Sequence, residues 1–577
     1  MEEKINITNR EKAINEANKV DKRIIEVLES GQSFRVEAGA GSGKTYSLNK
    51  VIEWLQDNKQ TDYQRKKQNI VCLTYTNVAV EVISERLADK SFIIPSTIHS
   101  FAWSAIKQYQ STLLKIIAEN DTLHPKEGDI SAVTEIQYEL GHRYISNDVM
   151  YLHHSDVITL FSIMLDSSKF RSVFANKFPL ILIDEYQDSF KTITDKFIEY
   201  FISKGVGPQF GFFGDAWQTI YQSNNVCGLI ENDNLIEIKK SSNFRSAEKI
   251  VDLLNRIRPN LPQISAMDEF QGETIAITCD DYTGARRTDR NFKNDLPAEE
   301  LRLRLATLNE YIKSNVIEKD ETIKNLMITH RILASQQGYD KLFGLIGDKI
   351  KDKDDDILLF FMNILEPVYN ALVTSDMALL FETLGIKRYP IQRKSEKKAW
   401  TNLKNELTIC REKSACDVLK LVIDTSLIPL PPKVANAYKL YQTDFCSEYN
   451  GIPIKEIMDL PYKQFIAAID FLHPETEFST EHGVKGEEYD NVIFVISKGW
   501  NQYQFDIYAP MLLHGNIPLD KQASFERNRN LFYVCCSRPA KRLYILITFP
   551  VDRNFETFLK KLVGDKNYYT YTEFLEK

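Results

Sequence analysis

A glycine-rich segment near the N-terminus constrains the fold of this chain more than any other feature. Residues 38–45 read Ala-Gly-Ala-Gly-Ser-Gly-Lys-Thr and follow an apolar run at 33–36. A strand, such a loop and a following helix form a phosphate-binding loop, in which backbone N–H groups surround the phosphates. We expect Lys44 to reach the β and γ oxygens and Thr45 to hold Mg²⁺. The predicted nucleotide-binding residues of this segment are Ala38 (where the general pattern has a glycine), Gly39, Ala40, Gly41, Ser42, Gly43, Lys44, Thr45 and Tyr46.

A second segment supplies the carboxylates that hydrolysis of a nucleotide requires. The apolar run at 180–183 ends in Asp184 and Glu185. Directly after a buried strand, Asp184 is suited to reach Mg²⁺ through water and Glu185 to polarise the attacking water as general base. An Asp-Glu pair alone is usually a solvent-exposed surface pair, but together with the phosphate loop it predicts a nucleotide hydrolase.

Apolar strands alternate with amphipathic stretches over much of the chain, which predicts an α/β fold. Strands are expected at 33–36, 70–74, 180–183 and 210–213, and a second set at 272–278, 325–329, 491–497 and 542–548. Such alternation indicates parallel sheets covered by helices on both faces, with ligands at the carboxyl ends of the strands. Two mainly helical stretches, at 106–170 and 341–470, interrupt this pattern.

Composition limits the class of protein without identifying it. A chain of 577 residues is too long for one hydrophobic core, so three or four lobes are expected. No run of eighteen apolar residues or signal-peptide pattern is present, which argues against a membrane protein. The eight cysteines are scattered without zinc spacing, which favours a cytoplasmic protein without a structural metal. The net charge of −8 leaves room for a local nucleic-acid track.

Further segments, in order, resemble the motifs of superfamily 1 helicases of the UvrD/Rep type. Residues 184–189 read Asp-Glu-Tyr-Gln-Asp-Ser, residues 214–221 read Gly-Asp-Ala-Trp-Gln-Thr-Ile-Tyr, and residues 242–246 read Ser-Asn-Phe-Arg-Ser. The segments 71–77, 96–101, 480–489 and 530–538 resemble the remaining motifs. The resemblance implies two RecA-like parallel-sheet domains with an ATP cleft between them.

The resemblance also implies roles for individual residues at that cleft. Arg245 and Arg538 would act as arginine fingers that neutralise γ-phosphate charge, and Gln218 would sense the γ-phosphate. Glu488 would accept a hydrogen bond from the ribose. Phe244 replaces the family's tyrosine and would stack on the base. ATP and Mg²⁺ are the implied cofactors.

Single-stranded DNA would be held by aromatic and polar side chains beside these motifs. The DNA-binding residues implied by the resemblance are Tyr75, Thr76, Asn77, His99, Phe101, Tyr221, Thr480 and His482; for Phe101, as for Trp103 and Trp217, a place in the core is the simpler interpretation. Two departures from the family pattern concern this site. Ser223 stands where the family has a base-stacking tryptophan, which puts processive unwinding in doubt. Asp21, Lys22 and Arg23 occupy the region of the adenine-reading glutamine, which indicates relaxed base selectivity.

The expected domain organisation follows from these patterns. The first RecA-like domain would comprise 1–105 and 171–246, with a helical insertion at 106–170. The second would comprise 247–340 and 471–577, with a reduced helical insertion at 341–470. Residues 228–232 and 242–245 are also similar to the helicase-like subunit of the Gabija antiphage system. That similarity implies a partner of the OLD-family ATPase–Toprim nuclease type.

Three functions are compatible with the sequence. The first is a DNA-stimulated ATPase that moves 3′ to 5′ on single-stranded or tailed duplex DNA as a translocase or helicase. The second is a DNA-end-sensing (d)NTP hydrolase subunit of a defence complex, with little unwinding. A nucleotide-switch scaffold that scarcely hydrolyses is the third, but an inactive site would have no need of Lys44, Glu185, Arg245 and Arg538.

Overall fold

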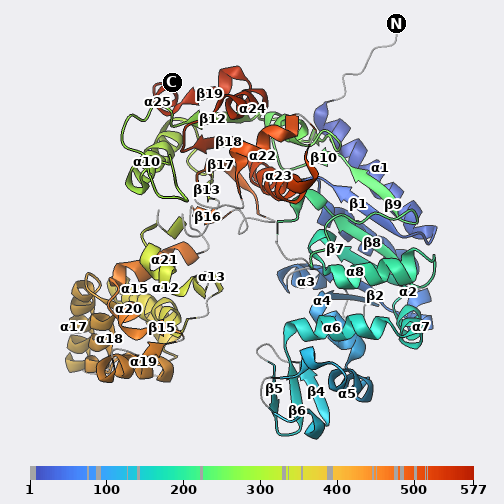
Figure 1. Ribbon diagram of the computed structural model, residues 1–577, viewed down its shortest axis with the longest axis horizontal. Coiled ribbons are helices and arrows are strands. Elements are labelled where there is room, and N and C mark those ends of the chain that lie inside the picture. The colour runs from blue at the N-terminus through green and yellow to red at the C-terminus, as the bar shows by residue number, and fades with distance from the viewer. Residues whose placement is uncertain are drawn as a thin grey trace.

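Two six-stranded parallel sheets form the framework of the molecule; in Figure 1 the first lies at the right and the second at the upper left. The computed structural model describes residues 8–577 except 75–76, 86, 88–91, 126–127, 139–142, 221–224, 328–332, 335–336, 348, 353–354, 386–393, 445–446, 450, 474–477, 481–486, 499–502, 514 and 516. The α/β fold with two RecA-like parallel-sheet domains is confirmed.

The first sheet has the strand order β3-β2-β7-β8-β1-β9. Its strands are β1 (Phe34–Ala38), β2 (Ile70–Thr74), β3 (Ile93–Thr97), β7 (Leu180–Asp184), β8 (Gln209–Gly214) and β9 (Ile236–Lys240). Alternate residues are buried on opposite faces: Ile70 and Cys72 pack with α1 and α2, whereas Val71 and Leu73 pack with α4, α6, α7 and α8. This burial on both faces explains why the strands read as continuous apolar runs. The covering helices are α1 (Asn9–Glu29), α2 (Lys44–Lys66), α3 (Asn77–Ser84), α4 (Ile98–Ile106), α6 (His154–Leu165), α7 (Ser168–Lys177) and α8 (Lys191–Phe197).

The second sheet has the strand order β16-β13-β17-β18-β12-β19. Its strands are β12 (Glu273–Thr278), β13 (Ile323–Met327), β16 (Phe478–Thr480), β17 (Tyr489–Ile496), β18 (Pro539–Ile547) and β19 (Tyr568–Thr570). One face packs on α9 (Glu248–Ile257), α23 (Gln522–Cys536) and α24 (Arg553–Val563), and the other on α10 (Ala298–Asn315) and α25 (Tyr571–Leu575). Ala40 and Ile220 of the first domain join the former cluster, so the two domains share apolar contacts.

The stretch at 106–170 is not purely helical. Besides α5 (Gln110–Ala118) it contains a three-stranded sheet of β4 (Glu135–Tyr138), β5 (Tyr144–Ser146) and β6 (Val149–Leu152). These strands are short and only partly buried, and their mixture of polar and apolar residues gave no strand signal. This small sheet lies below the first domain in Figure 1.

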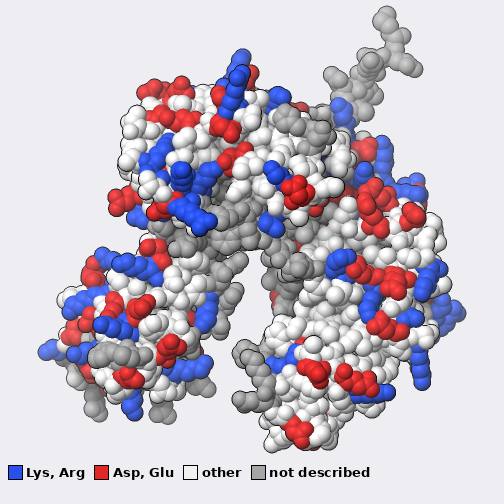
Figure 2. Space-filling model, in the orientation of Figure 1, with Lys and Arg blue, Asp and Glu red and all other residues white. Residues whose placement is uncertain are grey.

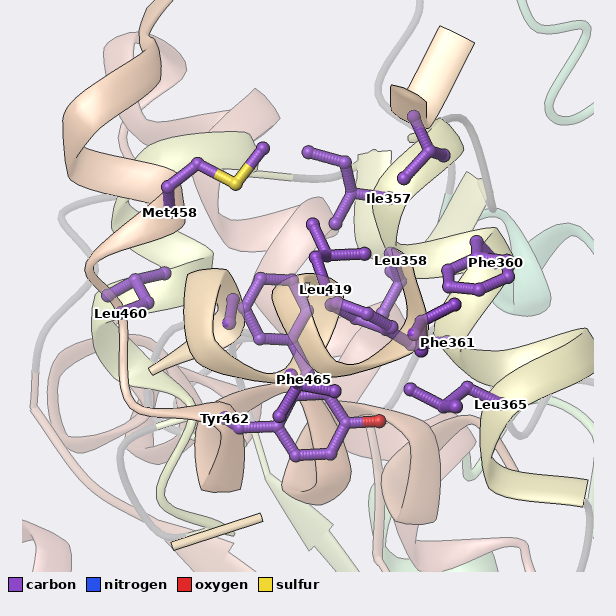
Figure 3. Packing of buried hydrophobic residues seen from close by; sticks show 14 of the residues in the cluster. Ile357, Leu358, Phe360, Phe361, Leu365, Leu419, Met458, Leu460, Tyr462 and Phe465 are labelled. Carbon is purple, nitrogen blue, oxygen red and sulfur yellow. The ribbon is translucent and has the colours of Figure 1, made fainter. Parts of the chain in front are cut away.

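Helices form most of the lobe below the second domain, apart from the hairpin of β14 (Glu448–Tyr449) and β15 (Ile452–Pro453). They are α12 (Asp340–Ile346), α13 (Lys349–Asp352), α14 (Asp356–Phe360), α15 (Glu366–Thr374), α16 (Met377–Leu384), α17 (Lys394–Cys410), α18 (Ala415–Thr425), α19 (Pro432–Thr443), α20 (Ile454–Met458) and α21 (Tyr462–Leu472). The helical stretch Asp356–Thr374 is long and apolar enough to span a membrane. Its residues Phe360, Phe361 and Leu365, however, pack with Tyr462 and Phe465 in the core of this lobe (Figure 3), which accounts for its apolar character.

The helical lobe and the small three-stranded sheet are separated by an open notch beneath the two RecA-like domains, as Figure 2 shows. On the face seen there, basic and acidic side chains are interspersed, so no surface of one sign dominates. The first large sheet draws its strands from the predicted segments 1–105 and 171–246, and the second from 247–340 and 471–577.

Candidate nucleotide-binding site

The glycine-rich loop joins the end of β1 to the start of α2, and its conformation requires glycine at two positions. Gly41 has φ 71° and Gly43, which precedes the first residue of α2, has φ 75°. This left-handed region is costly for residues with a Cβ atom. A Cβ atom on Gly41 would also lie 2.7 Å from both Arg245 Cβ and Asn243 Oδ1. The loop is therefore closely packed by Asn243 and Arg245, which lie near the C-terminal end of the first domain.

A cavity of about 380 Å³ opens in front of this loop. Residues of the phosphate loop, of the Asp-Glu segment and of the late helicase-like motifs line it together: Gly39, Gly41, Ser42, Gly43, Lys44, Thr45, Glu185, Gln218, Phe244, Arg245, Glu488 and Arg538. Most residues predicted for the nucleotide site therefore surround one space. Ala38 and Ala40 are buried instead, and Tyr46 lies beside the loop with 58 % of its surface exposed.

Asp184 and Glu185 stand at the carboxyl end of β7, beside the loop lysine. Lys44 Nζ lies 3.7 Å from Glu185 Oε1, and Gln187 Nε2 donates to Glu185 Oε2 at 2.6 Å. Gln187 thus orients the predicted general base. Asp184 is only 8 % exposed, and burial together with the neighbouring charge of Glu185 raises the pKa of its carboxyl above the ordinary range. A cation beside Asp184 would favour its ionised form.

The two predicted arginine fingers meet at the cavity. Arg538 is 1 % exposed and donates to the Val534 carbonyl and, at 3.4 Å, to Gln218 Oε1. Burial and, secondly, the positive charge of Arg245 lower the pKa of Arg538 to about 9. Arg245 Nε donates to Glu488 Oε2 at 3.0 Å. An anionic ligand would relieve the repulsion between these two guanidinium groups, as a triphosphate does.

Two aromatic residues, Tyr46 and Phe244, lie beside the loop. Tyr46 Cβ and Phe244 Cδ2 lie 3.7 and 3.8 Å from the position that a Cβ atom on Gly43 would occupy, and the Phe244 ring is 45 % exposed. Asp21, in the region of the missing glutamine, is instead buried behind the loop. It accepts from Ser47 Oγ at 2.5 Å and pairs with Lys50 at 2.9 Å. The Asp21 side chain is therefore already engaged within the protein.

The donor set of the site is chemically suited to Mg²⁺, which prefers oxygen ligands and binds through one or two carboxylates plus phosphates. Thr45 lines the cavity, and a cation bound beside Asp184 would favour the ionised form of its carboxyl. No group of three or more His, Cys, Asp or Glu residues that could hold a metal ion by itself occurs among the described residues. A metal here would thus depend on the phosphates for further ligands.

Only some of the residues predicted to contact DNA lie in the described part of the chain. Tyr75, Thr76, Tyr221 and His482 lie outside the described residues, as does Ser223. Asn77 begins α3 and Thr480 ends β16, but their side chains lie outside the described part. His99 packs against His154 with ring centroids 4.3 Å apart, and burial, aided by His154 and His153, lowers its pKa to about 4. His99 is therefore neutral near pH 7.

The prediction that Phe101 contacts DNA is wrong. Its side chain is 2 % exposed and lies among Phe161, Phe174 and Phe178, within the core that supports the first sheet. The position of Phe101 in a helicase-like motif suggested a contact. Because Phe101 lies on the inner face of α4, its ring packs in the core and does not reach a surface where DNA could bind.

Several residues that shape the site were not among the predicted site residues. Asn243 Nδ2 and Gln263 Nε2 each donate to the Ala40 carbonyl at 3.0 Å, and the Ala40 N–H donates to the Tyr533 hydroxyl at 3.2 Å. Asp215 Oδ2 accepts from Gln218 Nε2 at 2.8 Å. Asn243, Asp215 and Tyr533 lie within the motif segments and could have been found there, whereas Gln263 lies in none of them.

Comparisons with known proteins agree with this geometry. Residues 21–224 match the protein family described as an AAA domain. The Gabija protein GajB of Bacillus cereus is 22 % identical over 94 % of this chain and 96 % of its own length. The ATP-dependent DNA helicases Rep of Buchnera aphidicola and PcrA of Staphylococcus aureus are 27 % and 24 % identical, each over 39 % of this chain. These matches span 41 % of Rep and 38 % of PcrA.

Two RecA-like sheets and a phosphate loop that shares a cavity with two arginines are the architecture of the UvrD-like superfamily 1 helicases, and the chain is similar to that class. Within this class, the chain is related over nearly its whole length to the Gabija protein GajB.

Proposed function

We propose that this chain is a DNA-dependent ATPase that couples hydrolysis to 3′-to-5′ movement on single-stranded DNA as a translocase or helicase. The observation that carries the proposal is the cavity in which Lys44, Glu185, Gln218, Arg245 and Arg538 meet. These side chains come from both sides of the boundary between the RecA-like domains. Hydrolysis would therefore depend on how the two domains are placed, and that dependence would convert ATP turnover into movement.

The residues divide the chemistry in the following way. Lys44 and the backbone N–H groups of the loop hold the β and γ phosphates. Glu185, oriented by Gln187, accepts a proton from the attacking water. Arg245 and Arg538 neutralise the charge that develops on the transferred phosphoryl group. Thr45 and Asp184 would hold Mg²⁺, which would neutralise part of the phosphate charge.

Steady-state hydrolysis of ATP with and without single-stranded DNA tests this proposal. We expect DNA to stimulate turnover and Lys44→Ala to abolish it, because the variant loses the charge that holds the phosphates. Lys59→Ala is the matched control, since Lys59 lies on α2 but outside the cavity. Unchanged hydrolysis by Lys44→Ala would contradict the assignment of the site.

Relaxed base selectivity belongs to the same proposal. Phe244 and Tyr46 offer ring faces, which stack on any base, and Asp21 is engaged by Ser47 and Lys50. We expect kcat/KM for GTP and dATP to lie within roughly tenfold of that for ATP, since stacking distinguishes bases poorly. A preference for ATP above a hundredfold would contradict this expectation.

The second candidate, a DNA-end-sensing (d)NTP hydrolase with little unwinding, is favoured by the engagement of Asp21 in the region where the family has its adenine-reading glutamine and by Ser223 in place of the stacking tryptophan. Strand displacement on 3′-tailed and 5′-tailed duplexes separates the two. Displacement of 3′-tailed duplexes alone supports the helicase. Vigorous DNA-dependent hydrolysis with no displacement supports the sensor.

We further propose a cytoplasmic protein that serves a nuclease partner of the OLD-family ATPase–Toprim type in antiphage defence. The relationship to GajB over 94 % of the chain supports the defence role. The free cysteines at 72, 227, 279, 410, 416, 535 and 536 suit a reducing compartment. Affinity purification of the tagged chain from its native cells tests the partnership. Recovery without any nuclease would contradict it.

A further inference from the structure

A buried arginine outside every helicase-like motif joins the two RecA-like domains beneath the nucleotide cavity. Arg258 follows the last residue of α9, a helix that packs on β12 and β18 of the second domain. The Arg258 residue is 3 % exposed. Its Nη1 donates to Asp215 Oδ1 and its Nη2 to Glu37 Oε1, both at 2.6 Å. Glu37 lies in β1 and Asp215 directly follows β8, so both carboxylates belong to the first domain.

Each of these carboxylates is linked to a predicted catalytic residue. Asp215 accepts from the Gln218 amide through its other oxygen at 2.8 Å, and Gln218 in turn accepts from Arg538. Glu37 accepts from the Tyr186 hydroxyl at 2.8 Å, and Tyr186 directly follows Glu185. Arg258 is thus two hydrogen bonds away from Gln218, through Asp215, and is held at the base of the segment that carries Glu185.

Aromatic rings fix the guanidinium group in place. The Arg258 guanidinium carbon lies 5.1 Å from the ring centre of Trp217 and 5.6 Å from that of Tyr533. Tyr533 belongs to α23 of the second domain and also accepts from the Ala40 N–H in the phosphate loop. Burial opposes the charge of Arg258, but Asp215, Tyr533 and Glu37 more than offset it and raise its pKa. The guanidinium group therefore stays charged and bridges the two domains through two hydrogen bonds.

We propose that Arg258 is a positioning residue that couples the placement of the second domain to the orientation of Gln218 at the γ-phosphate end of the site. This role rests on the proposed ATP hydrolysis. The planar guanidinium fork presents donors in a fixed geometry to two carboxylates at once, whereas a lysine ammonium is a compact point charge without that fork. A shift of about 1 Å in a catalytic group can cost about a hundredfold in rate. Arg258 therefore acts on turnover through Asp215 and Gln218, without touching the nucleotide.

The first test is Arg258→Lys, which keeps the charge and removes the fork. We expect kcat at saturating DNA to fall by at least about tenfold while KM for ATP changes by less than about threefold, because binding groups are untouched. Arg304→Lys is the matched control: Arg304 donates to Glu300 and Asp281 and lies over the rings of Tyr282 and Tyr571, away from the cavity. We expect wild-type kcat from Arg304→Lys.

A double-mutant cycle separates positioning from general destabilisation. If Arg258 acts through Gln218, adding Arg258→Lys to Gln218→Ala lowers kcat by less than about threefold further, since coupled residues are not additive. Losses of kcat that multiply in the double variant would overturn the proposal, as would a wild-type kcat in Arg258→Lys. Equal losses of kcat and of melting temperature in Arg258→Lys and Arg304→Lys would overturn it as well.

If Arg258→Lys fails to fold, Asp215→Asn tests the same link from the first domain with an almost isosteric side chain. The same fall in kcat at unchanged KM supports the proposal, and wild-type kcat overturns it. Absence of hydrolysis by the wild-type chain would contradict the proposed function itself, which distinguishes the two failures.

Discussion

The charged forms of two side chains at the nucleotide site, Asp184 and Arg538, are less favourable in the free protein than they would be beside a ligand of opposite charge. Burial raises the pKa of Asp184 above its ordinary range, and burial with the nearby Arg245 lowers the pKa of Arg538 to about 9. Both shifts disfavour the charged forms of these two side chains. A metal–triphosphate complex carries the charges that would restore them, which is the pattern expected of a functional site.

Because ionisation of the buried Asp184 carboxyl is unfavourable in the folded protein, we expect Asp184→Asn to stabilise the nucleotide-free protein while it abolishes hydrolysis. The pKa of Asp184 is higher in the folded than in the unfolded chain. The folded state therefore loses stability as the pH rises from the unfolded-state pKa to the folded-state pKa. Removing the carboxyl removes the penalty, so we expect the first melting transition to rise by about 2 °C at pH 8. The gain should be smaller at pH 6. Equal gains at both pH values, or none, would contradict the shift of the Asp184 pKa.

At the scale of secondary structure, α4 supports the sheet through Phe101 and does not present this ring to DNA. We expect Phe101→Leu to lower the free energy of unfolding by about 1–2 kcal/mol, from lost packing against Phe161 and Phe174. Its affinity for single-stranded DNA, measured by fluorescence anisotropy at equal folded fraction, should remain within about twofold of wild type. A large loss of affinity at unchanged stability would restore Phe101 as a DNA contact.

Elements buried on both faces were predictable from sequence, and edge elements were not. The central strands β2 and β7 begin where their apolar runs begin, because both faces are covered. The outer strands β3, β9 and β19 were missed: β3 contains Pro95, β9 mixes exposed with buried positions, and β19 has three half-buried residues. For the site, ordered motifs predicted most cavity-lining residues. Arg258 and Gln263 escaped prediction, because only tertiary packing brings them to residues distant in sequence.

At the scale of the whole molecule, residues of both RecA-like domains line the nucleotide cavity, and the helical lobe and the small sheet face each other across the notch in Figure 2. Residues of the second domain reach the phosphate loop directly, since Tyr533 bonds Ala40 and Arg538 contacts Gln218. Relative movement of the domains would therefore alter the catalytic groups, and hydrolysis would in turn move the lobes that border the notch.

The most direct test that hydrolysis requires residues from both domains is the turnover number of Arg538→Lys in saturating tailed DNA. The affinity of the same variant for a fluorescent ATP analogue is measured in parallel. Lysine keeps the charge but lacks the planar fork, so we predict that kcat falls by about a thousandfold, the scale of an arginine-finger contribution, with the dissociation constant of the analogue within about fivefold of wild type. Hydrolysis within a few fold of wild type would contradict the two-domain site.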